Sequence, residues 1–457
     1  MPEFNQDYDK EKVLQKIEDA YNGENGYLNG EYLIKPSSES ENGFTARKKL
    51  ASWDDAFKMC VDSNVNPLFA TQPDRETMPS TDYVNAFLAD CDNAGTTYEL
   101  FIETLALDLK LFGSMLVVMD NFTELSSSQS ENILNRILPY IYTIRPDKIK
   151  YIKKDKFGRL ESVGFEEVYY DKDGTELKGI RYFSKDETIL YASDGEEVIS
   201  KAPLAIGRIP CFLAYASRST IKKRTISPSP ILSWWQTSDT TYQMFSEIRI
   251  LQRKFSFAQL AMQGVLNNSD DRPTIDDCIL MYDTEAKNAP QWIQPSVEAL
   301  NSLEDSRQQQ ISNLFRMAGL DYRFSGSGES GLAKKMAWEF AKLSFEALSD
   351  SMVRIEKEII KLFGVWVGET YDEYTPIYSR SLGVDDTEER IVNASKIDSF
   401  AGDVPEVKEI ITVESIRAYK KDLTDEQLKQ IGDSANALAT QQNIDASQSL
   451  PTPPQPE

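Results

Sequence analysis

The clearest hydrophobic pattern lies between residues 228 and 368, where apolar side chains recur at helical spacing in successive stretches. In the first stretch they are alternately four and three residues apart, which places them on one narrow stripe of a helix. The stripe consists of Met244, Ile248, Leu251, Phe255, Ala258 and Met262. Because proline is tolerated in a first helical turn, this helix is predicted to start within residues 227–230 and to end at Gly264.

Two more helices are predicted after a short insert, whose strand-like pieces are Ile279–Tyr282 and residues 292–293. The second helix carries its apolar residues on one side and stops at Gly319, a residue type that favours helix ends. Those apolar residues are Leu300, Leu303, Ile311, Leu314 and Ala318. Residues 325–331 contain no apolar side chain, and the third helix follows them from residue 332 to 363, about 45–50 Å long.

Shorter helices are predicted in the N-terminal part of the chain. They cover residues 9–20, 46–61, 83–90 and 96–112, with a surface loop at residues 22–42. Thr96 followed by Glu99 has the form of a capping box, which predicts the start of the fourth helix. Gly113 ends that helix, and the apolar run at residues 115–119 predicts a buried strand. Residues 126–132 are predicted to be a polar linker.

From residue 140 to 215 the pattern changes to short segments rich in Tyr, Ile, Val and Phe. Gly158, Gly174 and Gly195 separate these segments, and each follows a residue that makes a hairpin turn signal with it. We therefore predict an antiparallel meander. Its strands cover residues 140–143, 149–153, 162–170, 179–184, 188–192 and 197–199.

The last part of the chain is acidic and less regular. Helices are predicted at residues 385–400, 413–419 and 424–431. Residues 434–457 are rich in Ala, Gln, Asn, Ser and then Pro, and cannot bury enough apolar surface to order themselves. We predict that this tail is disordered.

The order of these elements resembles that of the portal proteins of tailed bacteriophages. Two phrases that bracket the meander, Thr143-Ile144-Arg145-Pro146 and Gly207-Arg208-Ile209-Pro210, are similar to those around the β-rich wing segment of that family. The resemblance implies an α+β fold with an α/β wing, a two-helix stem, a small α/β clip, a long wing helix and a helical C-terminal crown. It rests on the order and lengths of the elements and on these local phrases.

The resemblance also implies boundaries for each part of the chain. They are an N-terminal wing at 1–222, stem helix 1 at 223–263, the clip at 264–297, stem helix 2 at 298–318, a tunnel loop at 319–335, the long wing helix and the rest of the wing at 336–403, the crown at 404–433 and the tail at 434–457.

By the same resemblance, the protein forms a ring, typically a dodecamer, at one capsid vertex of a virion. Double-stranded DNA passes through its channel without sequence specificity during packaging and ejection. The clip is expected to meet the terminase and later the head–tail connector, and the wing to meet the major capsid protein. The residues of the tunnel loop expected to face DNA are Ser325, Gly326, Ser327, Gly328, Gly331, Lys334 and Lys335. The family implies assembly in the host cytoplasm, no cofactor, no metal and no catalysis, because the terminase uses the ATP.

The composition fits a folded protein of more than one domain. The chain has 457 residues, of which 40% are hydrophobic, enough to supply substantial cores. Its four cysteines lack CxxC spacing and fit a reducing compartment. No apolar run is long enough to cross a bilayer, and the first residues lack the basic flank and apolar core of a secretory signal. We expect no association with a membrane.

The net charge is −23, and the chain contains no histidine. Such a negative chain is not expected to grip nucleic acid, because tight binding needs Lys and Arg to replace counterions. The charge suits a wall past which DNA slides, and it equally suits simple solubility. The lack of histidine excludes Ser-His-Asp and Cys-His catalysis, HExxH zinc sites and His-based pH switches.

Residues 326–331 match the G-x-G-x-x-G dinucleotide fingerprint, with Asp350 about twenty residues further on. That fingerprint needs a buried parallel strand before the glycines, whereas a helix is predicted there, so a flexible loop is favoured. The D-x-D-G sequence at residues 171–174 indicates a hairpin turn, because Tyr169 and Ile180 stand where a calcium loop needs ligands.

Two charged clusters are interpreted as solvated surface rather than as binding sites. They are the acidic cluster Asp270, Asp271, Asp276 and Asp277 and the basic triplet Lys222, Lys223 and Arg224. Two other functions stay open as hypotheses: a capsid-associated adaptor or scaffold without a DNA channel, and a nucleotide-binding enzyme that uses the loop at residues 326–331. The apolar stripes also fit a self-contained helical bundle instead of a ring.

Overall fold

The computed structural model describes most of the first 378 residues and a few positions beyond them. The described residues are 8–122, 129–170, 173–204, 206–216, 226–256, 259–263, 279–282, 291–293, 297–320, 331–378, 408, 412–413, 429–434, 436–437 and 440. The chain divides into two compact units, Met1–Arg380 and Ser381–Glu457. The described positions of the second unit are helical, including 436–437 and 440 in the predicted disordered tail, where alanines favour a helix. The rest of the predicted C-terminal helices lies outside the described residues.

The N-terminal part of the first unit is helical. Its elements are α1 Tyr8–Asn22, α2 Gly26–Asn29, α3 Glu41–Lys49, α4 Ala56–Val65, the 3₁₀ turn η1 Asn66–Leu68 and α5 Asp82–Ala89. The prediction of one helix over residues 46–61 is wrong, because the chain breaks between α3 and α4. In the break, the ring of Trp53 packs against Tyr27 with centroids 4.1 Å apart, and Asp54 accepts a hydrogen bond from the N–H of Ala56 at 3.1 Å. The predicted loop at residues 22–42 contains α2.

Helix α6, Tyr98–Phe112, starts one residue later than the capping box predicted. Thr97 is the N-cap, and its hydroxyl accepts a hydrogen bond from the N–H of Leu100 at 3.4 Å. Thr96 belongs to the preceding turn, because its carbonyl accepts from the N–H of Cys91 at 2.9 Å. Gly113 ends the helix with φ 82°, as predicted, and a Cβ there would lie 2.2 Å from the carbonyl oxygen of Pro228.

A three-stranded antiparallel sheet follows, in the order β2-β1-β8. Its strands are β1 Ser114–Asp120, β2 Tyr140–Ile144 and β8 Cys211–Tyr215. Helix α7 Gln129–Leu134 comes between β1 and β2 in the sequence. The prediction that residues 140–143 belong to the meander is wrong, because Tyr140 pairs with Asp120 and Ile144 with Leu116. Helix α7 also lies where a polar linker was predicted, and it packs against α5.

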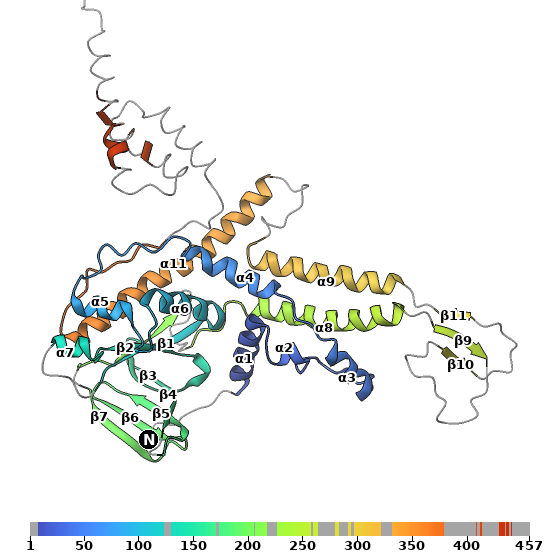
Figure 1. The fold of residues 1–457 in the computed structure, drawn as a ribbon, viewed down its shortest axis with the longest axis horizontal. Coiled ribbons are helices and arrows are strands. Elements are labelled where there is room, and N and C mark those ends of the chain that lie inside the picture. Colours follow the sequence, from blue (N-terminus) through green and yellow to red (C-terminus); the bar gives the residue numbers. More distant parts are fainter. Residues whose placement is uncertain are drawn as a thin grey trace, which may run out of the picture. The chain divides into compact units, whose positions relative to one another are not determined.

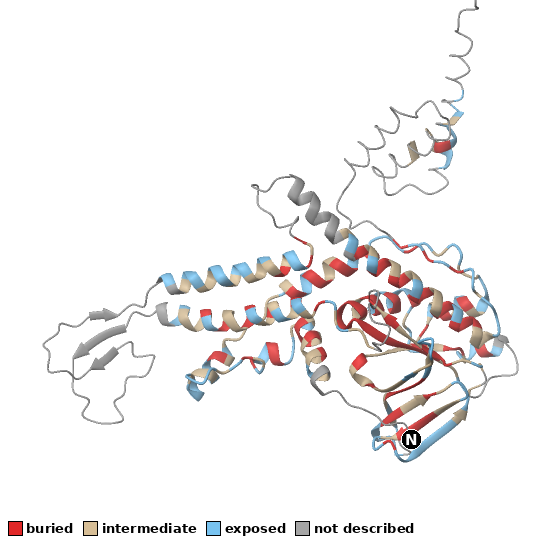
Figure 2. Ribbon diagram, turned by 180° about the vertical axis from the view of Figure 1, so that it is seen from behind, coloured by how far each residue is buried: buried red, intermediate tan, exposed pale blue. Residues whose placement is uncertain are grey.

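The predicted meander forms a five-stranded antiparallel sheet in the order β3-β4-β5-β6-β7. Its strands are β3 Ile149–Lys154, β4 Leu160–Tyr170, β5 Glu176–Phe183, β6 Glu187–Ala192 and β7 Val198–Pro203. The three turn glycines adopt positive φ angles, as the turn signals predicted. Leu116 and Val118 of β1 pack with Val163, Phe165 and Phe183 in one core between the two sheets, part of the buried interior seen in Figure 2.

The region from α8 onward has the predicted order of elements (Figure 1). It comprises α8 Leu232–Ser256, β9 Gln259–Gln263, β10 Ile279–Tyr282, β11 Gln291–Ile293, α9 Val297–Met317 and α11 Gly331–Val367. Helix α8 is shorter than predicted, because Met262 lies in β9, the central strand of a small sheet that pairs parallel with β10 and antiparallel with β11. Gly319 ends the second helix with φ 72°, as predicted. The mixture of helices and sheets confirms the α+β class.

Candidate functional site

Helices α8 and α9 lie side by side (Figures 1 and 2). Arg307 of α9 connects them, because its guanidinium lies 4.7 Å from the centre of the Phe245 ring of α8. The same guanidinium lies 3.7 Å from the carboxylate of Asp54, in the break before α4. A cation over an aromatic ring stabilises such a contact modestly. Helix α9 is therefore fixed both to α8 and to the N-terminal helices.

The buried side of α8 is more polar than the predicted apolar stripe. Among the stripe residues whose side chains are described, Ile248 is buried, whereas Met244 and Leu251 are half-buried. The buried positions also include the small hydroxyl residues Ser238, Thr241 and Ser246. The hydroxyls of Thr241 and Ser246 donate to carbonyls of their own helix, so burying them leaves no unpaired donor.

Arg47 of α3 uses one of these small residues to reach α8. Its Nη1 donates to the hydroxyl of Ser246 at 3.2 Å, and its Nη2 donates to the carbonyl of Ile34 at 2.6 Å. The buried guanidinium also forms an ion pair with Glu39 at 2.8 Å. Because a buried guanidinium is costly unless its donors are satisfied, this arrangement fixes α3 against α8.

A second connection to α8 runs through Tyr27 of α2. The hydroxyl of Tyr27 donates to the carboxylate of Asp239 at 2.9 Å and accepts from the indole N–H of Trp235 at 2.7 Å. Burial is the largest cause that holds the pKa of Tyr27 well above its ordinary value, and the nearby charge of Asp239 is the second. Tyr27 therefore stays protonated and keeps donating to α8.

The bases of α8 and α9 meet at a buried lysine of α6. The ammonium of Lys110 donates to Oδ1 of Asn64 at 3.2 Å and lies 4.8 Å from the centre of the Trp234 ring of α8. Nδ2 of Asn64 in turn donates to the carbonyl of Ala318, at the end of α9, at 3.1 Å. Burial lowers the pKa of Lys110 to about 8. We call Lys110, Asn64, Trp234 and Ala318 the root cluster, because both helices begin or end there.

A buried carboxylate holds the long helix α11 in the body. Arg75 donates to both oxygens of Glu356 at 3.0 Å, and the hydroxyl of Tyr374 donates at 2.8 Å. The hydroxyls of Tyr378 and Tyr98 donate to the same carboxylate. Burial, the largest single cause, lowers the pKa of Arg75. The hydrogen bond with Glu356 and the negative charge of Glu356 together outweigh burial, and the pKa lies above its ordinary value. We call these five residues the Glu356 cluster.

The predicted DNA-facing residues are only partly within the described chain. Ser325, Gly326, Ser327 and Gly328 lie outside it, and Gly331 is the first residue of α11. Lys334 and Lys335 follow in the first turns of α11, and their side chains are not described. The two charged clusters, Lys222 to Arg224 and Asp270 to Asp277, also lie outside the described residues.

The described residues contain neither a candidate metal site nor a candidate membrane-spanning helix. No group of three or more His, Cys, Asp or Glu side chains there is arranged to hold a metal ion. No helix in the same part of the chain is long and apolar enough to cross a membrane.

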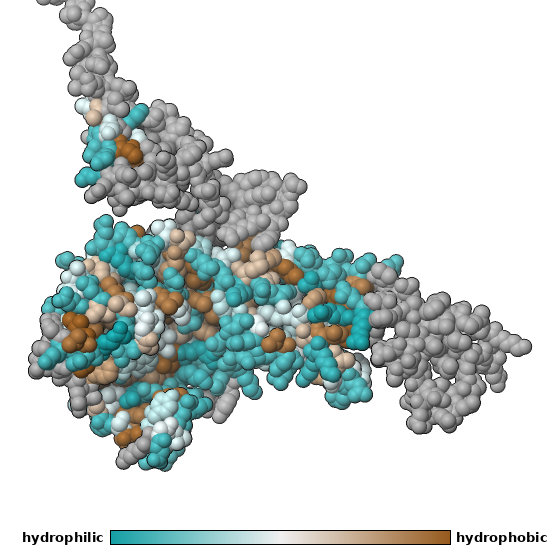
Figure 3. All heavy atoms as spheres, viewed as in Figure 1, coloured by the Kyte–Doolittle hydropathy of each residue, from teal (hydrophilic) through white to brown (hydrophobic). Residues whose placement is uncertain are grey.

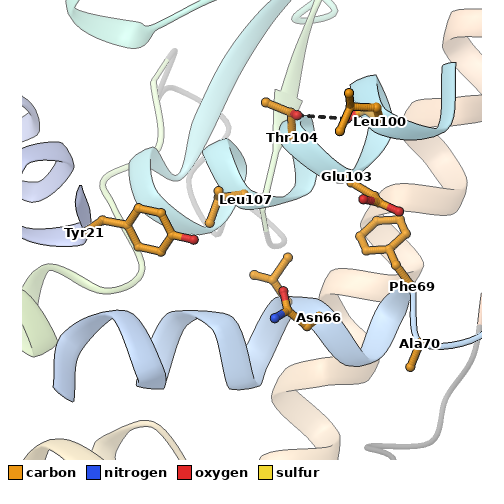
Figure 4. A pocket seen from close by; sticks show the side chains of 9 residues that line it. Tyr21, Asn66, Phe69, Ala70, Leu100, Glu103, Thr104 and Leu107 are labelled. Atoms are coloured by element: carbon orange, nitrogen blue, oxygen red, sulfur yellow. Dashed lines mark hydrogen bonds between the residues drawn. The ribbon is translucent and has the colours of Figure 1, made fainter. Parts of the chain in front are cut away.

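A surface groove lies between α6 and the end of α4, and nothing in the sequence analysis pointed to it. Its volume is about 510 Å³. It is lined by Tyr21, Val65, Asn66, Phe69, Ala70, Leu100, Glu103, Thr104 and Leu107 (Figure 4). Leu100 stands in the first turn of α6 among polar residues and is 54% exposed. An apolar residue on the otherwise polar side of a helix was the signal that could have located this groove.

Comparisons with known proteins gave weak similarity only. No family model matches the chain, and no curated protein matches it. The similar solved structures include two from gene transfer agent particles. One, described as the virion of a native gene transfer agent (GTA) particle, is 10% identical, covers 85% of this chain and 94% of its own, and has a TM-score of 0.39. The other, the neck of an empty GTA particle computed with C6 symmetry, is 12% identical, covers 81% and 92%, and scores 0.41. Both scores are below 0.5, so the likeness by itself establishes neither fold nor function.

Proposed function

We propose that this chain is the subunit of a portal ring at one vertex of a tailed-phage particle, with double-stranded DNA passing through the ring during packaging and ejection. The observation that carries the proposal is the pairing of α8 with α9, with a small three-stranded sheet between them in the chain and α11 after them. That is the stem, clip and wing-helix order that the sequence resemblance implied. Both similar structures belong to assembled particles, but the support comes from the contacts within this chain.

The root cluster and the Glu356 cluster support a mechanical role for the helices rather than a catalytic one. Lys110 and Asn64 fix the base of the α8–α9 pair, and Glu356 fixes α11. A channel that carries DNA under load needs its helices anchored to the outer body, and buried hydrogen-bonded charges supply such anchors. In this proposal the protein is not an enzyme, and the terminase uses the ATP.

The exposed side of α9 is suited to line a passage for DNA. Its exposed residues are polar or acidic over most of the helix, and they include Glu298, Asn301, Ser302, Asp305, Ser306, Gln308, Gln309 and Ser312. Because like charges repel, such a surface lets a duplex pass without sticking, in line with the net charge of −23. Lys334 and Lys335, after the glycine- and serine-rich loop, are proposed to be the exception that touches phosphates.

The partners follow from the same proposal. The small sheet of β9, β10 and β11 is the surface offered to the terminase and later to the head–tail connector. The wing, which contains the two larger sheets, meets the major capsid protein. The protein is assembled in the host cytoplasm and ends in the virion.

Native mass spectrometry of the purified protein tests the proposal. The expected result is a closed ring, at about 620 kDa for twelve copies of the 51.8 kDa chain. A strictly monomeric chain across salt and concentration would overturn the proposal. Deletion of residues 325–331 separates a portal from a capsid-associated adaptor. A portal still forms rings but fails to package DNA, whereas an adaptor is unaffected.

A further inference from the structure

The turn between β3 and β4 presents an aromatic ring between two cations. Phe157 is 72% exposed, the largest side chain at the tip of this hairpin. The ammonium of Lys156 lies 4.9 Å and the guanidinium of Arg159 5.7 Å from the centre of its ring. We call Lys156, Phe157 and Arg159 the hairpin tip. In a chain with a net charge of −23, this tip is locally basic and carries one exposed aromatic ring.

The hairpin tip is held in shape before it meets any partner. Oδ1 of Asp155 accepts from the N–H groups of Phe157 and Arg159, both at 2.8 Å. The N–H of Asp155 also donates to the carbonyl of Arg159 at 2.9 Å. Gly158 adopts φ 85°, and a Cβ at this position would meet nothing within 4 Å. A turn fixed in this way loses little conformational entropy on binding.

The groove between α4 and α6 has the opposite character. Its lining includes the apolar side chains of Val65, Phe69, Leu100 and Leu107. Figure 4 shows the carboxylate of Glu103 beside Phe69 and Leu100, at the end of the groove away from Tyr21. Glu99, one turn earlier on α6, is also exposed, and its carboxylate lies 3.8 Å from the guanidinium of Arg75.

The two ends of the groove differ in charge. At the other end, the ammonium of Lys58 lies 5.3 Å from the centre of the Tyr21 ring. The hydroxyl of Tyr21 donates to Asp62 at 2.7 Å. An apolar groove with an acidic end therefore has room for one aromatic ring and a place for a cation beside it. The face of the molecule in Figure 3 is largely hydrophilic, with apolar residues in small separate patches.

We propose that the hairpin tip of one copy of this chain docks in the α4–α6 groove of the neighbouring copy. Phe157 enters the groove beside Leu100, and Arg159 or Lys156 pairs with Glu103. Phe157 is too exposed to occupy the groove of its own chain, so the occupant comes from another molecule. The inference rests on the proposed function, since it concerns the contact between copies in a ring.

The charges favour a second copy over other occupants. Copies of a chain with a charge of −23 repel each other, so a stable contact between them needs local pairs of opposite charge. The hairpin tip and the acidic groove supply such a pair on two different surfaces of the same molecule. A contact between two different surfaces is heterologous, and repeated around a closing rotation it generates a ring.

A disulfide between mixed variants tests the contact directly. One variant carries Leu100→Cys and the other Phe157→Cys, each in a Cys278→Ser background; the other three cysteines are buried. Under mild oxidation we expect a covalent dimer in the mixture and none in either variant alone. Tyr170→Cys, 67% exposed on β4, replaces Phe157→Cys in a matched control and should not cross-link. A mixture that gives no dimer while native mass spectrometry shows intact rings would overturn the inference and leave the proposed function standing.

A charge exchange tests the pairing within the contact. Glu103→Lys and Arg159→Glu should each raise the protein concentration needed for ring assembly by about tenfold or more. The double variant should return that concentration to the value of the parent protein. Circular dichroism of each variant checks that the fold is intact. Rings with unchanged stability in both single variants would overturn the inference. A parent protein that forms no ring at any concentration would overturn the proposed function and the inference with it.

Discussion

Glu356 and Lys110 are both buried charged residues that join distant segments, but their surroundings are opposite. Glu356 is fully buried and accepts hydrogen bonds from a guanidinium and from three tyrosine hydroxyls. Lys110 is nearly as buried, yet its ammonium donates to a neutral amide and otherwise faces the ring of Trp234. Among the described residues, Glu356 is paired with an opposite charge and Lys110 is not.

This difference separates two ways of anchoring a helix. A buried carboxylate with an opposite charge and several donors fixes α11 rigidly, because breaking it leaves the buried Arg75 with only the more distant, exposed carboxylate of Glu99. A buried cation with neutral partners pays for its own desolvation and holds the bases of α8 and α9 less firmly. We therefore expect the Glu356 cluster to be permanent and the root cluster to be the weaker joint of the molecule.

The largest effect is expected from Glu356→Gln. The change leaves the buried guanidinium of Arg75 with only the exposed carboxylate of Glu99, 3.8 Å away, as counter-charge. It should lower the free energy of unfolding by about 3–5 kcal/mol. Urea denaturation followed by tryptophan fluorescence measures it. Glu358→Gln is the matched control, because Glu358 pairs with Arg208 at 2.6 Å nearer the surface, and its loss should cost less than about 1 kcal/mol. Equal effects in the two variants would remove the distinction drawn above.

The next effect concerns Lys110 and depends on pH. Its pKa is about 8 in the folded chain, below its value when unfolded, so the unfolded chain binds more protons between pH 8 and about 10.4. Stability should therefore rise with pH in this window, by about 2 kcal/mol between pH 7 and pH 9.5. Lys110→Met should abolish this rise. The measurement is the free energy of unfolding of parent and variant at both pH values, and parallel pH profiles for the two proteins would contradict the account.

A smaller loss is expected from Tyr374→Phe. The variant removes one hydroxyl that donates to Glu356 at 2.8 Å and leaves Arg75 in place, so the cost should be about 1–2 kcal/mol. Tyr371→Phe, in the same segment, serves as its control and should change stability by less than about 0.5 kcal/mol. Differential scanning calorimetry can compare the two. A loss from Tyr374→Phe as large as that from Glu356→Gln would mean that the hydroxyl, not the ion pair, holds the cluster.

The smallest effect is expected from an exposed ion pair. Lys153 and Glu161 lie 3.0 Å apart on β3 and β4, with about half of each side chain exposed to water. Water and salt screen this pair, so Lys153→Ala should leave the melting temperature unchanged within error. Because the pair flanks the hairpin tip, the same variant is a neutral control for the charge exchange at Arg159. A clear drop in melting temperature would show that surface pairs contribute here as buried ones do.

The sequence predicted the kinds of element well and their partners poorly. Local periodicity identified the three long helices and most strands of the meander, because spacing and turn glycines are local signals. The pairing of residues 140–144 with β1, and the break that lets Trp53 reach Tyr27, depend on contacts with distant residues. Met262 continued a helical spacing by chance and lies in β9.

Neither buried cluster could be read from spacing, for the same reason. Arg75 stands 281 residues from Glu356, and Asn64 stands 254 residues from Ala318. Lys110 did carry a local signal, since it lies between two leucines in an apolar helix. A lysine among buried apolar residues was the one indication of the root cluster, and its partners come from three other helices.

The most direct test of the central claim is electron microscopy of the purified, negatively stained protein. The account predicts ring-shaped end views with a central hole, formed by side-by-side copies of the α8–α9 pair. Single compact particles of one 51.8 kDa chain, with no ring at any protein concentration, would contradict it.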